Sequence, residues 1–477
     1  MMRLPVCRLA VSATWIATVL LVAPFARAQS PVEGVVAGVW TAAGSPYLVI
    51  DTCTVPIGQT LTIEADTSVL FAAGLGLVVD GQLVTNGTAS EPVTFAAAAP
   101  GATWLGIRVI GHGATPVTSE LRGCAFSDAL KALDLYIEGQ VDNQWTTLTT
   151  IVEHCTFDAS VETAIYADAY GYNFYQFMTP RRRHARVNPI VRGCVFTGCG
   201  AGVVVTPHGS CSTWCAGAES NVRVENCVFS GVAAAALRMI TDPITAGAPL
   251  FLCNTVRAGA AGVIVPSPFD AVIQNNIFET LGVAVERTGA DSGATFRNCF
   301  FGNTTNFVGY PASYGTTVLV NENGHPCDLG FNIFEHPQLA ADGRHLANES
   351  PCIDAGTDVA FTDDFDSDPR PQGCRTDIGA DERATFLFPF TRGDTNDDGG
   401  VDISDAVWLL NYLFLAGALN CEAAGDINDD DTLNLADAIT LLGVLFAGGS
   451  PTALSPICGA DATPGDTPCL ASQCPCL

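Results

Sequence analysis

The stretch Val224-Glu225-Asn226-Cys227-Val228-Phe229 is one instance of a short motif that recurs through the middle of the chain. The motif is an apolar residue, any residue, Gly, Asn or His, then Cys or Asn, any residue, and Phe or Val. Its Cys or Asn falls at Cys124, Cys155, Cys194, Cys227, Asn254, Asn276, Cys299 and Asn332. The two shortest intervals are 22 and 23 residues, and the longer ones leave room for inserted loops. A period of this length is typical of repeat proteins.

Second short apolar runs, such as Ala201–Val205 and Ala261–Val265, lie between the motifs. Each repeat therefore holds two or three short strands joined by Gly- and Asn-rich corners, and a unit this small must stack on its neighbours to bury its apolar face. A fixed Cys or Asn corner favours a right-handed parallel β-helix, because stacked Asn side chains can form a hydrogen-bonded ladder. Stacked Cys fills the same place as a small buried group, so we expect most of these cysteines to be free thiols. A β-sandwich is the structural alternative, but it has no such corner.

Both ends of this region carry a resemblance to a known group of proteins. Thr60–Glu64 and Leu77–Leu83 resemble the opening coils of secreted bacterial β-helix proteins of the pectate-lyase-like superfamily, and Ser350–Gly356 with Asp377–Glu382 is similar to their end segment. The resemblance implies an all-β fold, a right-handed parallel β-helix with a C-terminal cap segment over residues 29–385. It also implies a protein that binds or cleaves polysaccharide, although one fold hosts many functions.

Two acidic stretches follow, Asp394–Asp405 and Asp426–Asp437, 32 positions apart. Oxygen-bearing side chains fall at positions 1, 3, 5, 9 and 12 of each, which is the spacing of an EF-hand-type calcium loop. An apolar stretch with helical periodicity follows each loop. The doubled spacing predicts two Ca²⁺ sites, whereas clusters of Asp, Asn and Gly that merely form turns would not repeat in this way.

The paired loops resemble the dockerin module of secreted bacterial proteins, which implies a small α-helical calcium-binding domain over residues 386–449. The ligands that the resemblance implies are Asp394, Asn396, Asp398, the Gly400 carbonyl, Asp402 and Asp405 in the first loop, and Asp426, Asn428, Asp430, the Thr432 carbonyl, Asn434 and Asp437 in the second. Asp431 replaces the glycine expected at the bend, so the second site is expected to be weaker. Dockerins bind a cohesin partner through hydroxyl residues at loop positions 10 and 11, where this chain has Ile403-Ser404 and Leu435-Ala436. The implied partner is thus a cohesin-like protein or another surface protein, with an internal contact as the alternative.

The termini and the composition predict an exported protein. Residues 1–28 have the outline of a secretory signal peptide, with an early positive charge, an apolar core and a small-x-small cleavage site at Ala26-Arg27-Ala28. No later segment is long and apolar enough to span a bilayer. Nineteen cysteines suit an oxidising compartment, and residues 450–477 form a Cys-rich tail. A net charge of −28 argues against nucleic acid as a partner. The predicted location is outside the cell or on its surface.

The longest insertion in the repeat is the candidate ligand-binding region. It combines aromatic residues with arginines, and a second insertion adds a tryptophan; the candidate contacts are Tyr170, Tyr172, Tyr175, Arg181, Arg182, Arg183 and Trp214. Aromatic faces stack on sugar rings, and guanidinium groups bind carboxylate or sulfate. The alternative is that the aromatics pack on the coil and the arginines offset neighbouring acids. No catalytic motif is complete, so we predict a non-catalytic glycan-binding or adhesive surface protein. A polysaccharide lyase or glycoside hydrolase acting on acidic polysaccharide is the alternative, with Asp168 as a candidate acid.

Overall fold

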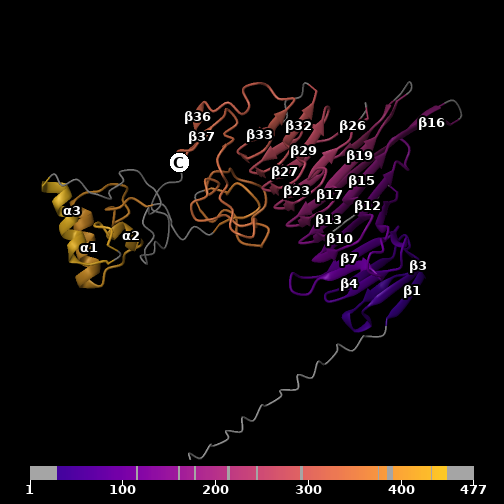
Figure 1. The fold of residues 1–477 in the computed structure, drawn as a ribbon, viewed down its shortest axis with the longest axis horizontal. Coiled ribbons are helices and arrows are strands. Elements are labelled where there is room, and N and C mark those ends of the chain that lie inside the picture. Colours follow the sequence, from indigo (N-terminus) through magenta and orange to yellow (C-terminus); the bar gives the residue numbers. More distant parts are fainter. Residues whose placement is uncertain are drawn as a thin grey trace, which may run out of the picture.

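The middle of the protein is a parallel β-solenoid in which each coil contributes up to three strands (Figure 1). The computed structural model describes residues 29–113, 117–158, 162–176, 179–211, 215–242, 245–289, 294–373, 375–383, 390–430 and 432–447. The predicted signal peptide and the Cys-rich tail lie outside these residues. The arrangement fits the expected all-β class and a parallel β-helix.

Three stacks of parallel strands form the solenoid wall. The first contains β2 (Gly38–Trp40), β4 (Thr60–Glu64), β7 (Gln82–Asn86), β10 (Val117–Arg122), β13 (Trp145–Glu153), β17 (Thr179–Arg192), β23 (Arg223–Glu225), β27 (Leu250–Leu252), β30 (Val272–Gln274) and β33 (Thr295–Phe296). The second contains β5 (Ser68–Phe71), β8 (Val93–Ala97), β11 (Cys124–Phe126), β14 (Thr156–Asp158), β18 (Val195–Thr197), β24 (Val228–Ser230), β28 (Thr255–Arg257), β31 (Ile277–Glu279) and β34 (Cys299–Phe301). The third contains β6 (Gly76–Val79), β9 (Gly106–Gly111), β12 (Lys131–Glu138), β15 (Thr163–Tyr170), β19 (Val203–His208), β25 (Leu237–Met239), β29 (Ala261–Pro266), β32 (Val283–Thr288) and β35 (Thr305–Val308). Strands β1 (Ser30–Val35) and β3 (Tyr47–Val55) begin both the second and the third stack.

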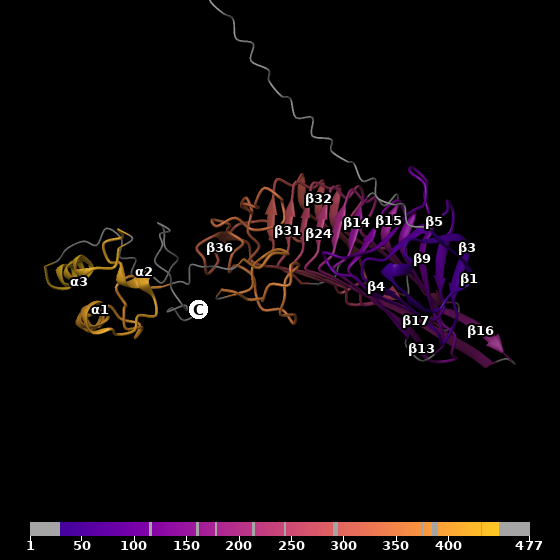
Figure 2. The same ribbon diagram turned by 90° about the horizontal axis from the view of Figure 1, so that it is seen from below.

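Side chains alternate between the solenoid interior and its surface, as the two-residue period of a strand requires. In β13, for example, every second residue from Thr146 to Val152 is buried. In-register pairing places identical residues above one another, and Phe126, Phe157, Phe196 and Phe229 stack with ring centroids 4.3–4.9 Å apart. Figure 2 shows these neighbouring strands side by side along the solenoid. The repeated Phe of the motif is therefore the core of the second stack.

The motif's Cys or Asn forms a buried column at the corner before the second stack. Asn254, Asn276, Asn298 and Asn332 make a ladder in which each amide nitrogen donates to the next carboxamide oxygen, at 2.9–3.0 Å. The prediction placed Cys299 in this column, and that was wrong: Cys299 pairs with Ile277, the first residue of β31, and Asn298 holds the ladder position. The motif starts one residue earlier there, and only the pairing register reveals it.

The cysteines of the same column are free thiols, as expected. Cys124, Cys155, Cys194 and Cys227 of the column are buried free thiols, and so are Cys53, Cys253, Cys299, Cys327 and Cys352 outside it. Cys227 Sγ lies 3.2 Å from the carbonyl oxygen of Glu225 and 3.6 Å from that of Val191, so it donates a weak hydrogen bond within and between coils. The thiol thus donates to backbone carbonyls in these coils, as the Asn amide does in later coils.

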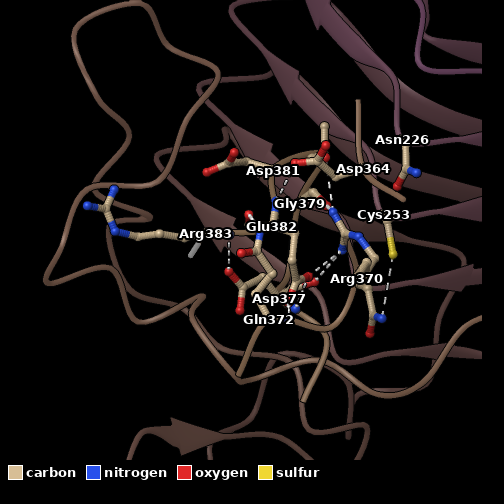
Figure 3. A network of polar contacts seen from close by, with 12 residues as sticks. Asn226, Cys253, Asp364, Arg370, Gln372, Asp377, Gly379, Asp381, Glu382 and Arg383 are labelled. Carbon is tan, nitrogen blue, oxygen red and sulfur yellow. Dashed lines mark hydrogen bonds and ion pairs between the residues drawn. The ribbon is translucent and has the colours of Figure 1, made fainter. Parts of the chain in front are cut away.

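The segment after the last coil folds back over the solenoid wall as a cap. It bonds to three successive coils, with Asn226 Nδ2 donating to the Asp363 carbonyl, Ala380 N to Thr255 Oγ1 and Gly379 N to the Asn275 carbonyl. Its centre is the fully buried Arg370, whose guanidinium lies 3.3 Å from Glu382 and donates to three backbone carbonyls (Figure 3). Burial raises the pKa of Glu382 to about 7.

Several short elements lie outside the three main stacks. They are the 3₁₀ turn Ala42–Gly44, β16 (Tyr172–Gln176), which pairs antiparallel with β17, β20 (Ser210–Cys211) with β21 (Cys215–Ala216), β22 (Ala218–Ser220), β26 (Thr245–Ala246), and β36 (Leu319–Val320) with β37 (Pro326–Cys327).

A small helical module follows, containing α1 (Ile403–Leu415), α2 (Glu422–Gly425) and α3 (Leu435–Ala447). Helices α1 and α3 pack together through Ala406, Leu409, Ala438 and Leu441, which are all buried. Among the described helices, none has the length and apolar character needed to cross a membrane.

Candidate functional site

The first acidic loop wraps around the carboxylate of Asp405, in the first turn of α1. Asp405 Oδ1 accepts hydrogen bonds from the backbone amides of Thr395 and Asn396, at 2.8 and 3.1 Å, and its Oδ2 accepts from Asp402 N at 2.8 Å. At the start of the loop, Asp394 accepts from the amides of Asp398 and Gly399. Gly399 has φ +85°, the left-handed conformation expected at the bend of such a loop.

The second loop repeats this arrangement around Asp437, in the first turn of α3. Asp437 accepts from the amides of Ile427 and Asn428 at 3.0 and 3.3 Å, and from Asn434 N at 2.8 Å. The contacts match those of Asp405, 32 residues earlier, bond for bond. The two loops are therefore copies in backbone geometry as well as in sequence. Asp431, where the second loop departs from the glycine pattern, lies outside the described residues.

The loops fit a hard divalent cation. Asp394, Asp405, Asp426 and Asp437 are buried, and burial raises the pKa of both Asp394 and Asp437 above the ordinary value for an aspartate. The carboxamide oxygen of Asn428, a predicted ligand at position 3, is buried and accepts no hydrogen bond within the described part of the chain. Buried acids grouped with an unsatisfied oxygen are costly unless a cation is bound, and a set of oxygen donors alone suits Ca²⁺.

The ninth loop positions have a structural role on their own. The exposed Asp402 caps α1 by accepting hydrogen bonds from Ser404 N and Ser404 Oγ, each at 2.7 Å, and these bonds lower its pKa. Asn434 accepts from Ala436 N in the same way and donates to the Thr432 carbonyl. Their contribution to cation binding, directly or through water, stays a prediction, as does that of the Gly400 carbonyl.

The arginine-rich insertion forms the hairpin β16–β17, in which Tyr172 lies opposite Arg183. Arg183 donates to Asp142 Oδ1 at 2.8 Å and to the Tyr172 hydroxyl at 2.7 Å, and Arg181 lies 3.7 Å from the other oxygen of Asp142. The structure thus brings Tyr172 and Arg183 together, with an acid against two of the arginines. Arg182 faces Asn173 in the register. The side chain of Tyr175 and all of Trp214 lie outside the described residues.

The third stack holds a row of polar and aromatic side chains that sequence reasoning did not assemble. Register pairs Tyr136 with Asp168, and Tyr170 with His208. Tyr170 stacks on His208 at 4.4 Å between ring centroids, and His208 Nε2 lies 3.3 Å from Asp168 Oδ1. We call this set, with Arg108 over the ring of Tyr136, the tyrosine row. Tyr170 was predicted as a ligand contact, but its neighbours come from other coils.

A hollow of about 280 Å³ adjoins the tyrosine row, lined by Leu105, Arg108, Lys131 and Asp134 among others. Arg108 lies 3.5 Å from Asp134, and the Lys131 ammonium lies 3.8 Å from the ring centroid of Tyr166. The outward face of this sheet therefore combines aromatic rings, cations and acids, which are the groups that contact sugars.

The pKa of the Asp168 carboxyl is raised toward neutral pH. Burial raises its pKa to about 6, although the nearby His208 acts in the opposite direction. The folded protein then holds this proton more tightly than the unfolded chain, so stability falls as the pH rises from about 4 to about 6.

Asp168→Asn is expected to flatten this fall of stability between about pH 4 and pH 6, as measured by urea midpoints between about pH 4 and pH 8. Asp158→Asn, at an exposed aspartate on β14, is the control; an equal effect of both variants would contradict the assignment.

Comparison with known proteins adds no relative. A scan of the chain against known protein families, a search of curated proteins and a search of solved structures each found no match.

Proposed function

We propose that this protein is an exported, calcium-dependent surface protein, in which the helical module binds two Ca²⁺ ions and docks on a partner while the solenoid binds a glycan. The observation that carries the proposal is the 32-residue duplication. It repeats the buried acids of both loops, together with the amide contacts that hold Asp405 and Asp437.

Docking is supported by a second duplicated feature, the outward face of each helix. Ile403, Val407 and Phe414 on α1 are 55–65% exposed, and the residues 32 positions later on α3, Leu435, Ile439 and Phe446, are 48–70% exposed. Exposed apolar faces of this kind mark interaction surfaces. The face of α1 borders a hollow that also contacts Asn396 and Asp398 of the first loop, so cation binding and docking would be coupled.

Calorimetric titration of the full chain with Ca²⁺ tests the core of the proposal. We expect two equivalents bound per chain, with the first loop tighter, and release of both by a chelator. Binding of no Ca²⁺, or of an equal amount of Mg²⁺ with equal affinity, would overturn it, since Mg²⁺ demands a smaller octahedral site.

Glycan binding is assigned to the tyrosine row. Retention on immobilised acidic and neutral polysaccharides should fall on replacing Tyr170 by alanine, because the exposed ring supplies stacking area. Leu329→Ala removes an exposed apolar side chain elsewhere and serves as the control. Equal retention of all three proteins would remove the tyrosine row from the proposal.

A polysaccharide lyase or glycoside hydrolase is the second candidate, and Asp168 favours it. A carboxyl with a pKa of about 6 on a sugar-contacting face is suited to act as a general acid. New reducing ends or unsaturated products, formed by the native protein and lost in Asp168→Asn with glycan retention intact, would establish the enzyme. Retention without product favours the binding protein.

A further inference from the structure

Three potential metal ligands converge in the cap, away from the calcium loops in sequence. His345, Asp366 and Asp381 each offer one ligand atom, and these atoms lie within 4.8 Å of one another. His345 Nε2 is 2.6 Å from Asp366 Oδ2. The three residues come from three separate segments of the chain, so the cluster exists only in the folded cap.

Asp381 is the buried member of this cluster. It is 5% exposed and lies at the edge of the network around Arg370 (Figure 3). Its Oδ2 accepts a hydrogen bond from Leu346 N at 2.7 Å, which aligns the carboxylate beside His345. No donor in the described part of the chain bonds to its Oδ1. A nearly buried carboxylate beside an imidazole is stabilised by a positive charge, which a bound cation would supply.

The imidazole of His345 is held from behind by a further carboxylate. Asp342 Oδ2 bonds to His345 Nδ1, and Asp342 Oδ1 accepts from the amides of Arg344 and His345. Pairing of one ring nitrogen with a carboxylate is the usual outer contact of a metal-bound histidine, because it fixes the tautomer and the ring orientation. On the other side of the cluster, Asp364 accepts from the amides of Asp366 and Asp368 and so holds the turn that carries Asp366.

We propose that His345, Asp366 and Asp381 bind a divalent cation of the zinc class, with Asp342 as the positioning residue. An imidazole nitrogen with two carboxylates suits Zn²⁺ and similar borderline cations, whereas Ca²⁺ takes oxygen ligands. Tetrahedral Zn²⁺ keeps its ligand atoms roughly 3.3 Å apart, so Nε2 and Asp366 need to separate only slightly to admit it. The bound cation joins three segments of the cap, and water completes the site.

The alternative is that the four residues form only a hydrogen-bonded cluster. In that case both nitrogens of His345 donate, Nδ1 to Asp342 and Nε2 to Asp366, and the imidazole carries a charge. With a cation bound, a neutral imidazole donates its Nδ1 proton to Asp342, and its Nε2 binds the cation, which also binds Asp366. The two arrangements differ in zinc binding, which makes them separable by experiment.

The test titrates the full chain with Zn²⁺ in buffer that already holds saturating Ca²⁺. We expect one tight Zn²⁺ equivalent that raises the melting temperature, and its loss in His345→Gln. Asp342→Asn should weaken Zn²⁺ binding by about 10–100-fold. His336→Gln, which replaces an exposed histidine nearby, should bind as the native protein does. Co²⁺ bound at the site should give a visible absorption spectrum that His345→Gln lacks.

Equal Zn²⁺ binding by His345→Gln and the native protein, or no Zn²⁺ binding by either, would overturn the inference. The Ca²⁺ stoichiometry measured on the same samples is independent of His345. A failure of the zinc site is therefore distinguishable from a failure of the proposed calcium-dependent function.

Discussion

Asp405→Asn is expected to weaken Ca²⁺ binding at the first loop by at least about 100-fold, because ligand charge sets the affinity of such loops. The substitution also changes an oxygen that accepts from Asp402 N or from the amides of Thr395 and Asn396. A site filled at about 100 times its Kd stabilises the folded state by about 2.7 kcal/mol, and a 100-fold weaker site at the same Ca²⁺ concentration loses about 2.3 kcal/mol of this. Calorimetry gives the affinity, and helical circular dichroism during thermal unfolding in Ca²⁺ and in chelator gives the stability.

Asp397→Asn is the matched control. It makes the same change of charge in the same loop, but Asp397 is exposed and occupies position 4, which carries no ligand. We expect it to retain Ca²⁺ binding within a fewfold. If both variants lose binding equally, the net charge of the loop rather than its geometry holds the ion, and the predicted ligand set is wrong.

The second large effect is expected for Asn276→Ala, in the middle of the corner ladder. Asn276 is fully buried; its Nδ2 donates to the carbonyls of Phe251 and Gln274 and to Asn298, and its Oδ1 accepts from the amide and the side chain of Asn254. Alanine leaves several of these groups without a partner in a dry interior. We expect a loss of about 3–5 kcal/mol in the free energy of unfolding, measured by urea denaturation.

Asn276→Cys separates hydrogen bonding from packing. Cysteine occupies the same column in the earlier coils, where the Cys227 thiol reaches carbonyls of its own coil and of the preceding one. The thiol should therefore restore part of the donor function, with a loss well below that of alanine. A cysteine variant as unstable as Asn276→Ala would show that the amide oxygen, which no thiol replaces, carries the ladder.

The repeat and the two duplicated acidic loops could be predicted from short stretches of sequence. A coil must present Phe to the interior and a small buried group at the corner, so the motif recurs wherever a coil turns. The pairing register between coils is harder to predict, because insertions vary the spacing of the motif. The misplacement of Cys299 by one residue shows this. The candidate ligands Tyr172 and Arg183 could be paired only once the hairpin set their register.

The sequence by itself determined the stacked coils, the Cys and Asn corner and the two oxygen-rich loops, because each depends on residues close together in the chain. The tertiary structure alone decided which side chains meet across coils and turns. Tyr136 lies beside Asp168, and Tyr170 beside His208, through strand pairing between coils of unequal length. The cap meets coils up to 137 residues earlier, and His345, Asp366 and Asp381 meet only when it closes. No local period encodes such contacts, since they depend on how the whole solenoid stacks.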